Sequence, residues 1–314
     1  MVSIVTVTFN ARDHVVNCLA SVVEARPMDG TYEHIVVDNA SDDGTAEAVA
    51  AFDGVILLRS EENAGFARGA NAGMSTAGGD YLLLLNPDCI LPQGAVEGLV
   101  RFMEEHPGVG AASPMLVTPE GAPQISYARF PRLLPHLLGL SPLGWLLPRR
   151  LKDIGFSGVP PSLSEQDPRP VDAPAGSCLL VRRAALDATG GMDERFFTYY
   201  EDIDWAYRMA RAGWQRYYVP AVRVVHDMGA TWRTLPQGLQ LARSYEGKYI
   251  YFSARHGPGA GALVRWTTLV CARLNLFLAA LLSVLGFCNA NWQRKRAFNR
   301  MLLSAHHTYS IRVR

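Results

Sequence analysis

Short apolar runs alternate with amphipathic segments along the first 106 residues of the chain. The runs are rich in Val, Ile and Leu, as in strands buried within a sheet, and the segments between them repeat apolar positions with helical spacing. The pattern predicts four strand-then-helix units. The expected strands are 2–9, 34–39, 55–60 and 80–88, and the expected helices are 14–24, 42–52, 62–77 and 92–106.

This repeat predicts an α/β fold with a mostly parallel, Rossmann-like central sheet, right-handed crossovers and helices on both faces. Ligands of such sheets bind beyond the carboxyl ends of the strands. The polar residues at those ends are Thr8, Asn10, Asp38, Asn39 and Asp88. We expect them to converge on one crevice.

Asp88 ends the most apolar run of the chain, which contains four consecutive leucines. It is either a turn residue that bonds its own backbone or a carboxylate presented to a ligand. If the ligand is a nucleoside diphosphate, Thr8 and Asp38 would meet the base or the ribose. A divalent cation held by Asp88 would then offset the phosphate charge.

A glycine-rich segment, residues 63–73, precedes the leucine run. It offers Gly65 for close backbone approach, Arg68 for phosphate charge and a helix N-terminus for free N–H groups. The segment is neither the dinucleotide pattern GxGxxG nor a P-loop, which disfavours a dehydrogenase or an ATPase. We include Asn71 of this segment, and Asn86 after the leucines, among the candidate donor contacts.

Three acids, Glu201, Asp202 and Asp204, crowd the start of an expected helix after the aromatic residues of 196–200. Acids there either complement the helix dipole or serve chemistry. A carboxylate set among aromatic rings has a raised pKa and suits a general base that activates a hydroxyl acceptor. His226, at the end of a later strand, is either structural or a metal ligand facing Asp88.

The composition describes a globular chain, since 49% of its 314 residues are hydrophobic and 19% are charged. Its first residues alternate β-branched side chains and predict a strand, not a signal peptide. The five cysteines are scattered and form no CxxC pair. This argues against a disulfide framework and against a zinc site, and it favours a reducing cytosol.

The charge is unevenly distributed. Residues 1–246 carry 20 basic and 29 acidic side chains, whereas residues 247–314 carry 10 basic and no acidic ones. The basic part encloses the apolar stretch 274–288, a pattern that favours an anionic membrane surface over nucleic acid. Fifteen residues span about 22 Å of helix, short of a bilayer core of about 30 Å, so we expect an interfacial or re-entrant helix. A buried helix of a soluble fold is the alternative.

Six segments resemble, in order, those of the GT-A fold family 2 inverting glycosyltransferases, and specifically their rhamnosyltransferase-like branch. They are VSIVTVTFN, VVDNASDDGT, ENAGFARGANAG, LLLLNPD, the stretch from GSCLLVRR to YYEDIDWAYRMARAGW, and PAVRVVHDMGAT. The resemblance covers residues 2–232. It implies a nucleotide-sugar donor, a divalent metal (Mg²⁺ or Mn²⁺), and displacement with inversion at the anomeric carbon.

By position, the resemblance assigns nucleobase binding to Asp38, metal binding to Asp88 and the role of catalytic base to Asp202. It assigns His226 to the metal or diphosphate site. The position of the family's DxD motif reads Asn86-Pro87-Asp88 and lacks the first acid, as in many members of this branch, so the metal dependence needs a test. Glu201 and Asp204 are the alternatives for the base. Glu201 is also included among the candidate donor contacts.

The sequence thus predicts a catalytic domain at 1–235 and a basic, apolar, helical membrane-associating region at 236–314. The Pro- and Leu-rich insertion 118–172 is either an acceptor-side lid or a plain insertion. We expect transfer of rhamnose from dTDP-rhamnose to a polyprenyl-diphosphate-linked glycan on the cytoplasmic face of the plasma membrane. The alternatives are another donor, such as a UDP-linked hexose or galactofuranose, a nucleotidyltransferase, and a non-catalytic membrane-tethered binding protein.

Overall fold

The structure is a computed structural model that describes residues 1–25, 32–140, 162–227, 236–284 and 290–309. The middle of the insertion, the motif end at 228–232, Cys288 and the last residues of the apolar stretch lie outside the described residues. The chain forms two compact units. The first comprises Met1–Phe130, Gly158–Phe197 and Glu201–Thr234, and the second comprises Pro131–Ser157, Thr198–Tyr200 and Leu235–Arg314.

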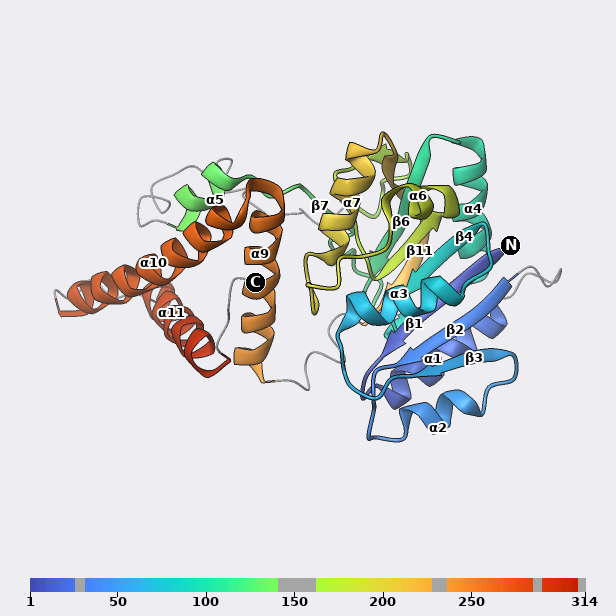
Figure 1. Cartoon of the computed structure of the whole chain (residues 1–314), viewed down its shortest axis with the longest axis horizontal. Helices are drawn as coiled ribbons and strands as arrows, with labels where there is room; N and C mark the ends of the chain where they lie inside the picture. Colours follow the sequence, from blue (N-terminus) through green and yellow to red (C-terminus); the bar gives the residue numbers. More distant parts are fainter. Residues whose placement is uncertain (26–31, 141–161, 228–235, 285–289, 310–314) are drawn as a thin grey trace. The chain divides into compact units, whose positions relative to one another are not determined.

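The first unit is built on a sheet with strand order β3-β2-β1-β4-β10-β6-β11-β5, with β8 paired to β11 (Figure 1). The strands β1 to β4 run parallel, as do β6 and β11, while β10 is antiparallel to both of its neighbours. The expected α/β architecture is therefore confirmed, with one antiparallel strand inserted in its middle. The bounds are β1 (Val2–Thr8), β2 (Tyr32–Asp38), β3 (Val55–Arg59), β4 (Tyr81–Leu85), β5 (Cys89–Ile90), β6 (Val109–Val117), β8 (Arg169–Pro170), β10 (Cys178–Arg182) and β11 (Gln215–His226).

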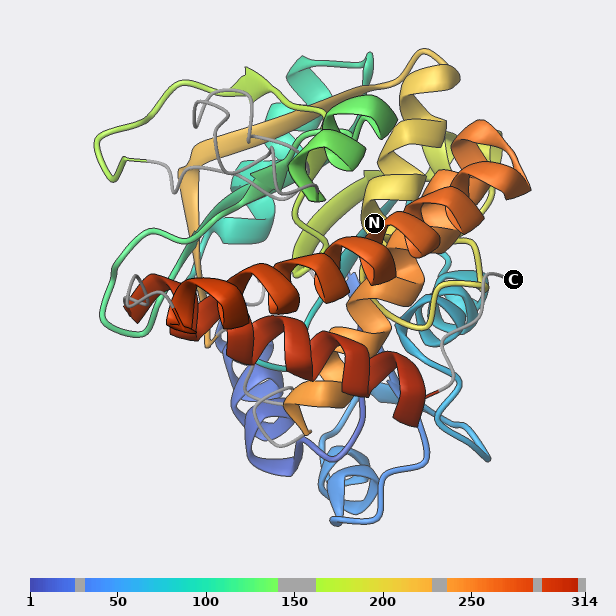
Figure 2. The ribbon, with the colours of Figure 1, turned by 90° about the vertical axis from the view of Figure 1, so that its left-hand side faces the viewer.

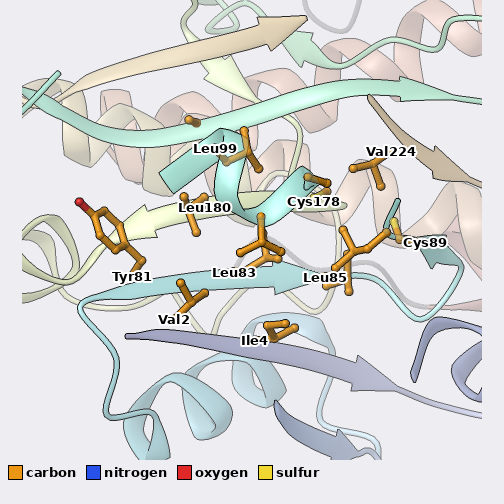
Figure 3. Packing of buried hydrophobic residues seen from close by; sticks show 14 of the residues in the cluster. Val2, Ile4, Tyr81, Leu83, Leu85, Cys89, Leu99, Cys178, Leu180 and Val224 are labelled. Carbon is orange, nitrogen blue, oxygen red and sulfur yellow. The ribbon is translucent and has the colours of Figure 1, made fainter. Parts of the chain in front are cut away.

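Helices cover both faces of the sheet, which explains why β4 is apolar along its whole length. Leu83 and Leu85 pack with Leu180 of β10 and Leu99 of α4 in one core cluster (Figure 3), while Leu82 and Leu84 are buried as well. The helices of this unit are α1 (Arg12–Glu24), α2 (Thr45–Ala50), α3 (Phe66–Thr76), α4 (Ala95–Glu105), α6 (Arg183–Thr189) and α7 (Glu201–Arg211). A small second sheet pairs β7 (Tyr127–Ala128) with β9 (Ala173–Pro174).

Helix α3 packs unusually close to the sheet through two glycines. A Cβ at Gly69 would lie 2.7 Å from Cγ1 of Val7, and one at Gly73 would overlap the side chain of Val5. These glycines therefore serve helix–strand packing. The glycine-rich segment was expected to allow close backbone approach to a ligand, and its two helical glycines instead approach the sheet.

The second unit consists of helices α5 (Leu133–Leu140), α9 (Gln237–His256), α10 (Pro258–Val284) and α11 (Ala290–Thr308), which are visible in Figures 1 and 2. The ring nitrogen Nδ1 of His306 donates to the carbonyl of Leu302 (2.8 Å), so Nε2 accepts from the Tyr249 hydroxyl (2.8 Å) and fastens α11 to α9. Gly261 approaches Tyr249 and Ser253 closely enough to exclude a side chain. This contact lets α10 pack against α9.

Helix α10 is longer than the apolar stretch suggested. Its 27 residues begin at Pro258, and Pro258–Leu281 is long and apolar enough to cross a membrane by length and composition alone. Arg265 and Arg273 interrupt the apolar pattern without ending the helix. The expectation that this helix is too short to span a membrane is therefore wrong, judged by its length.

Candidate active site

The carboxyl ends of β1 and β2 present two polar atoms that no described residue satisfies. Thr8 pairs with Asp38 in the parallel register, so their side chains end the two strands side by side. The hydroxyl oxygen of Thr8 and Oδ1 of Asp38 are buried and have no hydrogen-bond partner among the described residues. Oδ2 of Asp38 accepts from the Ser41 N–H at 3.1 Å. Because a buried polar atom without a partner is costly, these two atoms are suited to a ligand.

Two asparagines shape the loops around these strand ends. Asn10 adopts a left-handed conformation (φ +47°), and its Oδ1 accepts from the Asp42 N–H at 2.9 Å. Asn39 donates from Nδ2 to the carbonyl of Gly65 at 3.1 Å. Both side chains thus brace neighbouring loops, and their predicted contact with a donor stays a prediction.

Asp88 and His226 meet at the ends of β4 and β11. Strand β5 pairs Cys89 with His226, and the Asp227 N–H donates to the carbonyl of Asp88 at 2.9 Å. Nε2 of His226 lies 3.4 Å from Oδ1 of Asp88, and that oxygen is buried without a hydrogen-bond partner among the residues described. With Sγ of Cys89 added, the three possible ligand atoms lie within 4.8 Å of one another.

The sequence did not single out Gln124, which contacts His226 at both ends of its amide. Oε1 lies 3.0 Å from Nδ1 of His226, and Nε2 donates to the His226 carbonyl at 2.6 Å. Gln124 follows the loop after β6, and its own N–H donates to the carbonyl of Leu116. Nothing in the local sequence marks this residue, because only the folded sheet brings it to the end of β11.

Two adjacent residues that precede β10, Gly176 and Ser177, bind Asp202 and the turn at Asn86. The Gly176 N–H donates to Oδ2 of Asp202 at 3.2 Å, and the Ser177 carbonyl accepts from the Asn86 N–H at 2.8 Å. A Cβ at Gly176 would lie 3.1 Å from that of Asp202. The first turn of α7 and the end of β4 are therefore neighbours at the same edge of the sheet.

The three acids of α7 differ in their surroundings. Burial raises the pKa of Glu201, helped by the nearby charge of Asp202, and burial also raises the pKa of Asp202 despite its hydrogen bonds from Ile203 and Gly176. Asp204, in contrast, is paired with Arg208 at 2.9 Å, and Arg208 also holds the Thr189 carbonyl. This pairing gives Asp204 a structural role and leaves Asp202 and Glu201 as candidates for the base.

The glycine-rich segment reaches toward α7 as well. Gly65 has φ +91°, and its missing Cβ makes room for the backbone of Phe197, whose carbonyl accepts from the Phe66 N–H at 2.7 Å. The first N–H of α3 is thus used by the protein. Arg68 is exposed and lies 3.5 Å from Glu62 and from Glu194.

Asn71 holds a loop. Its Nδ2 donates to the carbonyl of Met192 and its Oδ1 accepts from the N–H of the same residue, each at 2.8 Å. Both ends of the amide are engaged, which ties α3 to the segment before α7. The predicted donor contact of Asn71 has no free polar atom to support it, so we assign it to positioning that segment.

All four cysteines that the structure describes are free and buried. Burial raises the pKa of the thiols of Cys18, Cys89 and Cys178. Burial thus disfavours the thiolate form of these core cysteines.

The chain is similar in sequence to known proteins. Residues 3–155 match the model of glycosyl transferase family 2. The chain is 32% identical over 278 residues to the N-acetylglucosaminyl-diphospho-decaprenol L-rhamnosyltransferase of Mycobacterium tuberculosis, which covers 84% of this chain and 88% of that protein.

Two solved structures are similar at low identity. The mannosyltransferase PcManGT from Pyrobaculum calidifontis, in complex with GDP-Man and Mn²⁺, has a TM-score of 0.57 at 16% identity and covers 98% of this chain and 86% of its own. S. aureus TarS 1–349 with UDP-GlcNAc has a TM-score of 0.53 at 13% identity, with coverage of 100% and 93%. At these identities the likeness establishes the fold.

Proposed function

The chain belongs to glycosyltransferase family 2, and from this premise we propose that it transfers L-rhamnose from dTDP-rhamnose to a polyprenyl-diphosphate-linked N-acetylglucosamine, with inversion at the anomeric carbon. The rhamnosyl group and the acceptor follow from the name of the rhamnosyltransferase to which the chain is 32% identical over most of its length, and dTDP as the nucleotide is part of our proposal. The structural observation that supports the proposal most is the row of unsatisfied buried oxygens at the strand ends, on Thr8, Asp38 and Asp88.

Donor binding begins at β1 and β2. The free Oδ1 of Asp38 accepts from an N–H of the pyrimidine base or from a ribose hydroxyl, and the Thr8 hydroxyl bonds to the same nucleoside. Each bond satisfies an atom that has no partner among the residues described, so binding recovers a desolvation cost already present in the protein. Arg68 adds positive charge on the diphosphate side.

The residues present fit a divalent cation between Asp88 and His226. Oδ1 of Asp88 has no hydrogen-bond partner among the described residues, and Nε2 of His226 faces it at 3.4 Å, which leaves a carboxylate and an imidazole directed at one point. Imidazole beside carboxylate suits a transition-metal ion such as Mn²⁺ better than Mg²⁺, which prefers oxygen ligands. When bound, such an ion would neutralise negative charge on the diphosphate leaving group.

The acceptor hydroxyl is activated by Asp202. Burial raises the pKa of Asp202, which makes its carboxylate a stronger base than that of an exposed aspartate, and the N–H groups of Gly176 and Ile203 fix the orientation of both carboxylate oxygens. As the carboxylate takes the hydroxyl proton, the hydroxyl oxygen attacks the anomeric carbon and the bond to the dTDP oxygen breaks on the opposite side. Glu201 lies deeper, with a relative exposure of 7%, and has the less accessible carboxylate.

We propose that the second unit, including α5 of the insertion, serves the lipid acceptor at the cytoplasmic membrane surface. Among the described side chains of helix α10, six large apolar ones are exposed, and their spacing of 3, 4 or 8 residues places them on one face. They extend over about 30 Å of helix and comprise Leu263, Trp266, Leu274, Phe277, Leu281 and Val284. The exposed basic residues Arg294, Lys295 and Arg300 of α11 add attraction to anionic headgroups.

The test is transfer by the full chain. The enzyme is incubated with labelled dTDP-rhamnose, polyprenyl-diphosphate N-acetylglucosamine in mixed micelles, and Mn²⁺ or Mg²⁺. The proposal predicts label in the lipid fraction and an anomeric configuration opposite to that of the donor. Transfer only from a UDP-linked hexose or galactofuranose would reassign the donor. Donor binding without transfer or hydrolysis from any sugar nucleotide would instead identify a non-catalytic binding protein.

A further inference from the structure

Gln124 has two hydrogen bonds to one residue, and their chemistry determines which ring nitrogen of His226 carries the proton. The backbone carbonyl of His226 is only an acceptor, so the group 2.6 Å from it must be the NH₂ of the Gln124 amide. The other end of the amide is then Oε1, which is only an acceptor. Because this oxygen lies 3.0 Å from Nδ1, Nδ1 carries the hydrogen and donates it.

When the His226 imidazole is neutral, its lone pair is therefore on Nε2, the atom that faces Oδ1 of Asp88 at 3.4 Å. Both of these atoms are acceptors, and both side chains are 7% exposed. Two buried acceptors directed at each other repel unless something positive lies between them. Gln124 thus maintains the form of His226 that is ready to ligate a cation.

We propose that Gln124 is a positioning residue that locks His226 in the Nδ1–H tautomer and so directs Nε2 toward Asp88 for a divalent cation. This inference rests on the proposed metal site, but the tautomer itself is a property of the protein without metal. A metal-ligating histidine is commonly oriented by an acceptor on its other nitrogen, and loss of such a partner typically weakens metal binding 10- to 100-fold. Gln124, which lies in the connection after β6, supplies that acceptor to a histidine at the end of β11.

The first experiment measures the tautomer in the metal-free full chain. Long-range ¹H–¹⁵N correlation spectra of the imidazoles distinguish a protonated Nδ1 from a protonated Nε2, and a His226→Gln spectrum assigns the signals. We expect His226 to be protonated at Nδ1 in the wild type and in Gln124→Glu, whose carboxyl group in its neutral form keeps an oxygen opposite Nδ1 and a donor toward the His226 carbonyl. In Gln124→Leu we expect the Nε2–H form to gain population. A wild-type His226 protonated at Nε2 would overturn the inference without any variant.

The second experiment measures Mn²⁺ binding by the loss of the free-ion signal in electron paramagnetic resonance. Gln124→Leu should weaken binding about 10- to 100-fold, and Gln124→Glu should retain it. Gln93→Leu, at an exposed glutamine, is the matched control and should bind as the wild type does. Equal Mn²⁺ affinity and an unchanged tautomer in Gln124→Leu would overturn the inference.

The two experiments also separate this inference from the metal proposal. If the wild type shows the Nδ1–H tautomer and Gln124→Leu loses it, while none of the proteins binds Mn²⁺, the positioning role of Gln124 stands and the metal site fails.

Discussion

Replacing Asp202 by asparagine removes the proposed base with little change in shape. Oδ1 retains its bond from the Ile203 N–H at 2.8 Å, while the new NH₂ faces the Gly176 N–H, which loses its acceptor at 3.2 Å. One lost hydrogen bond costs about 1 kcal/mol. Removal of a carboxylate whose pKa burial has raised offsets part of that cost. We therefore expect the unfolding free energy to change by no more than about 1 kcal/mol.

The effect on turnover should be far larger. General-base catalysis contributes about 10²- to 10⁴-fold to rate, so kcat of Asp202→Asn should fall by that factor, equivalent to about 3 to 5 kcal/mol of transition-state stabilisation. The dissociation constant for dTDP-rhamnose should change less than about threefold, since Asp202 does not serve the nucleotide. In the wild type, kcat should rise with pH through a pKa above the ordinary aspartate range, because the base must be deprotonated.

The assay combines calorimetric donor binding with transfer of labelled rhamnose to the lipid acceptor. Glu201→Gln and Asp204→Asn are the matched controls. The second of these breaks the pair with Arg208 and should lower stability, but it should preserve kcat per folded molecule. Turnover of Asp202→Asn within tenfold of the wild type would refute its role. An active Asp202→Asn together with an inactive Glu201→Gln would move the base to Glu201.

Three further changes test other parts of the account. Thr8→Val deletes a buried hydroxyl that lacks a partner among the described residues. It should therefore raise the unfolding free energy by about 1 kcal/mol in denaturant titrations and weaken dTDP binding several-fold. Unchanged binding would exclude Thr8 from the donor site. Burial raises the pKa of Glu201, so ionising it costs more in the folded state, and wild-type stability should decline as pH rises above the ordinary value of 4.5. Glu201→Gln should flatten that decline, and an identical pH dependence would contradict the burial argument. The double variant Trp266→Asn, Phe277→Asn removes two exposed apolar side chains, whose burial in lipid is worth about 1.5 to 3 kcal/mol each. Its affinity for anionic vesicles, measured by co-sedimentation, should fall more than tenfold. The control Ile125→Asn in the first unit should have no effect.

The side-by-side position of Thr8 and Asp38 could be predicted because it follows from topology. Parallel strands share the edge at which their carboxyl ends lie, so Thr8, Asp38 and Asp88 were expected together once the strand-then-helix repeat was recognised. The burial of two leucine faces on β4 follows from the same repeat. These inferences need only periodicity and the order of elements.

What escaped prediction depends on contacts between distant segments. Gln124 reaches His226 only after β6 and β11 have paired, and Asn71 meets Met192 across 121 positions of sequence. The glycines of α3 had two possible uses, and only the distance to Val5 and Val7 decides between them. The length of helix α10 was underestimated because its arginines interrupt the apolar run from which the helix was predicted, although the helix itself is continuous.

The most direct test of the central claim is a crystal structure of the full chain with dTDP and Mn²⁺, in which anomalous scattering locates the metal. The account predicts an anomalous peak about 2 Å from both Oδ1 of Asp88 and Nε2 of His226, with the base of dTDP bonded to Thr8 and Asp38 and the Asp202 carboxylate facing the space beyond the diphosphate. A nucleotide bound away from the ends of β1 and β2, or a metal peak without Asp88, would contradict it.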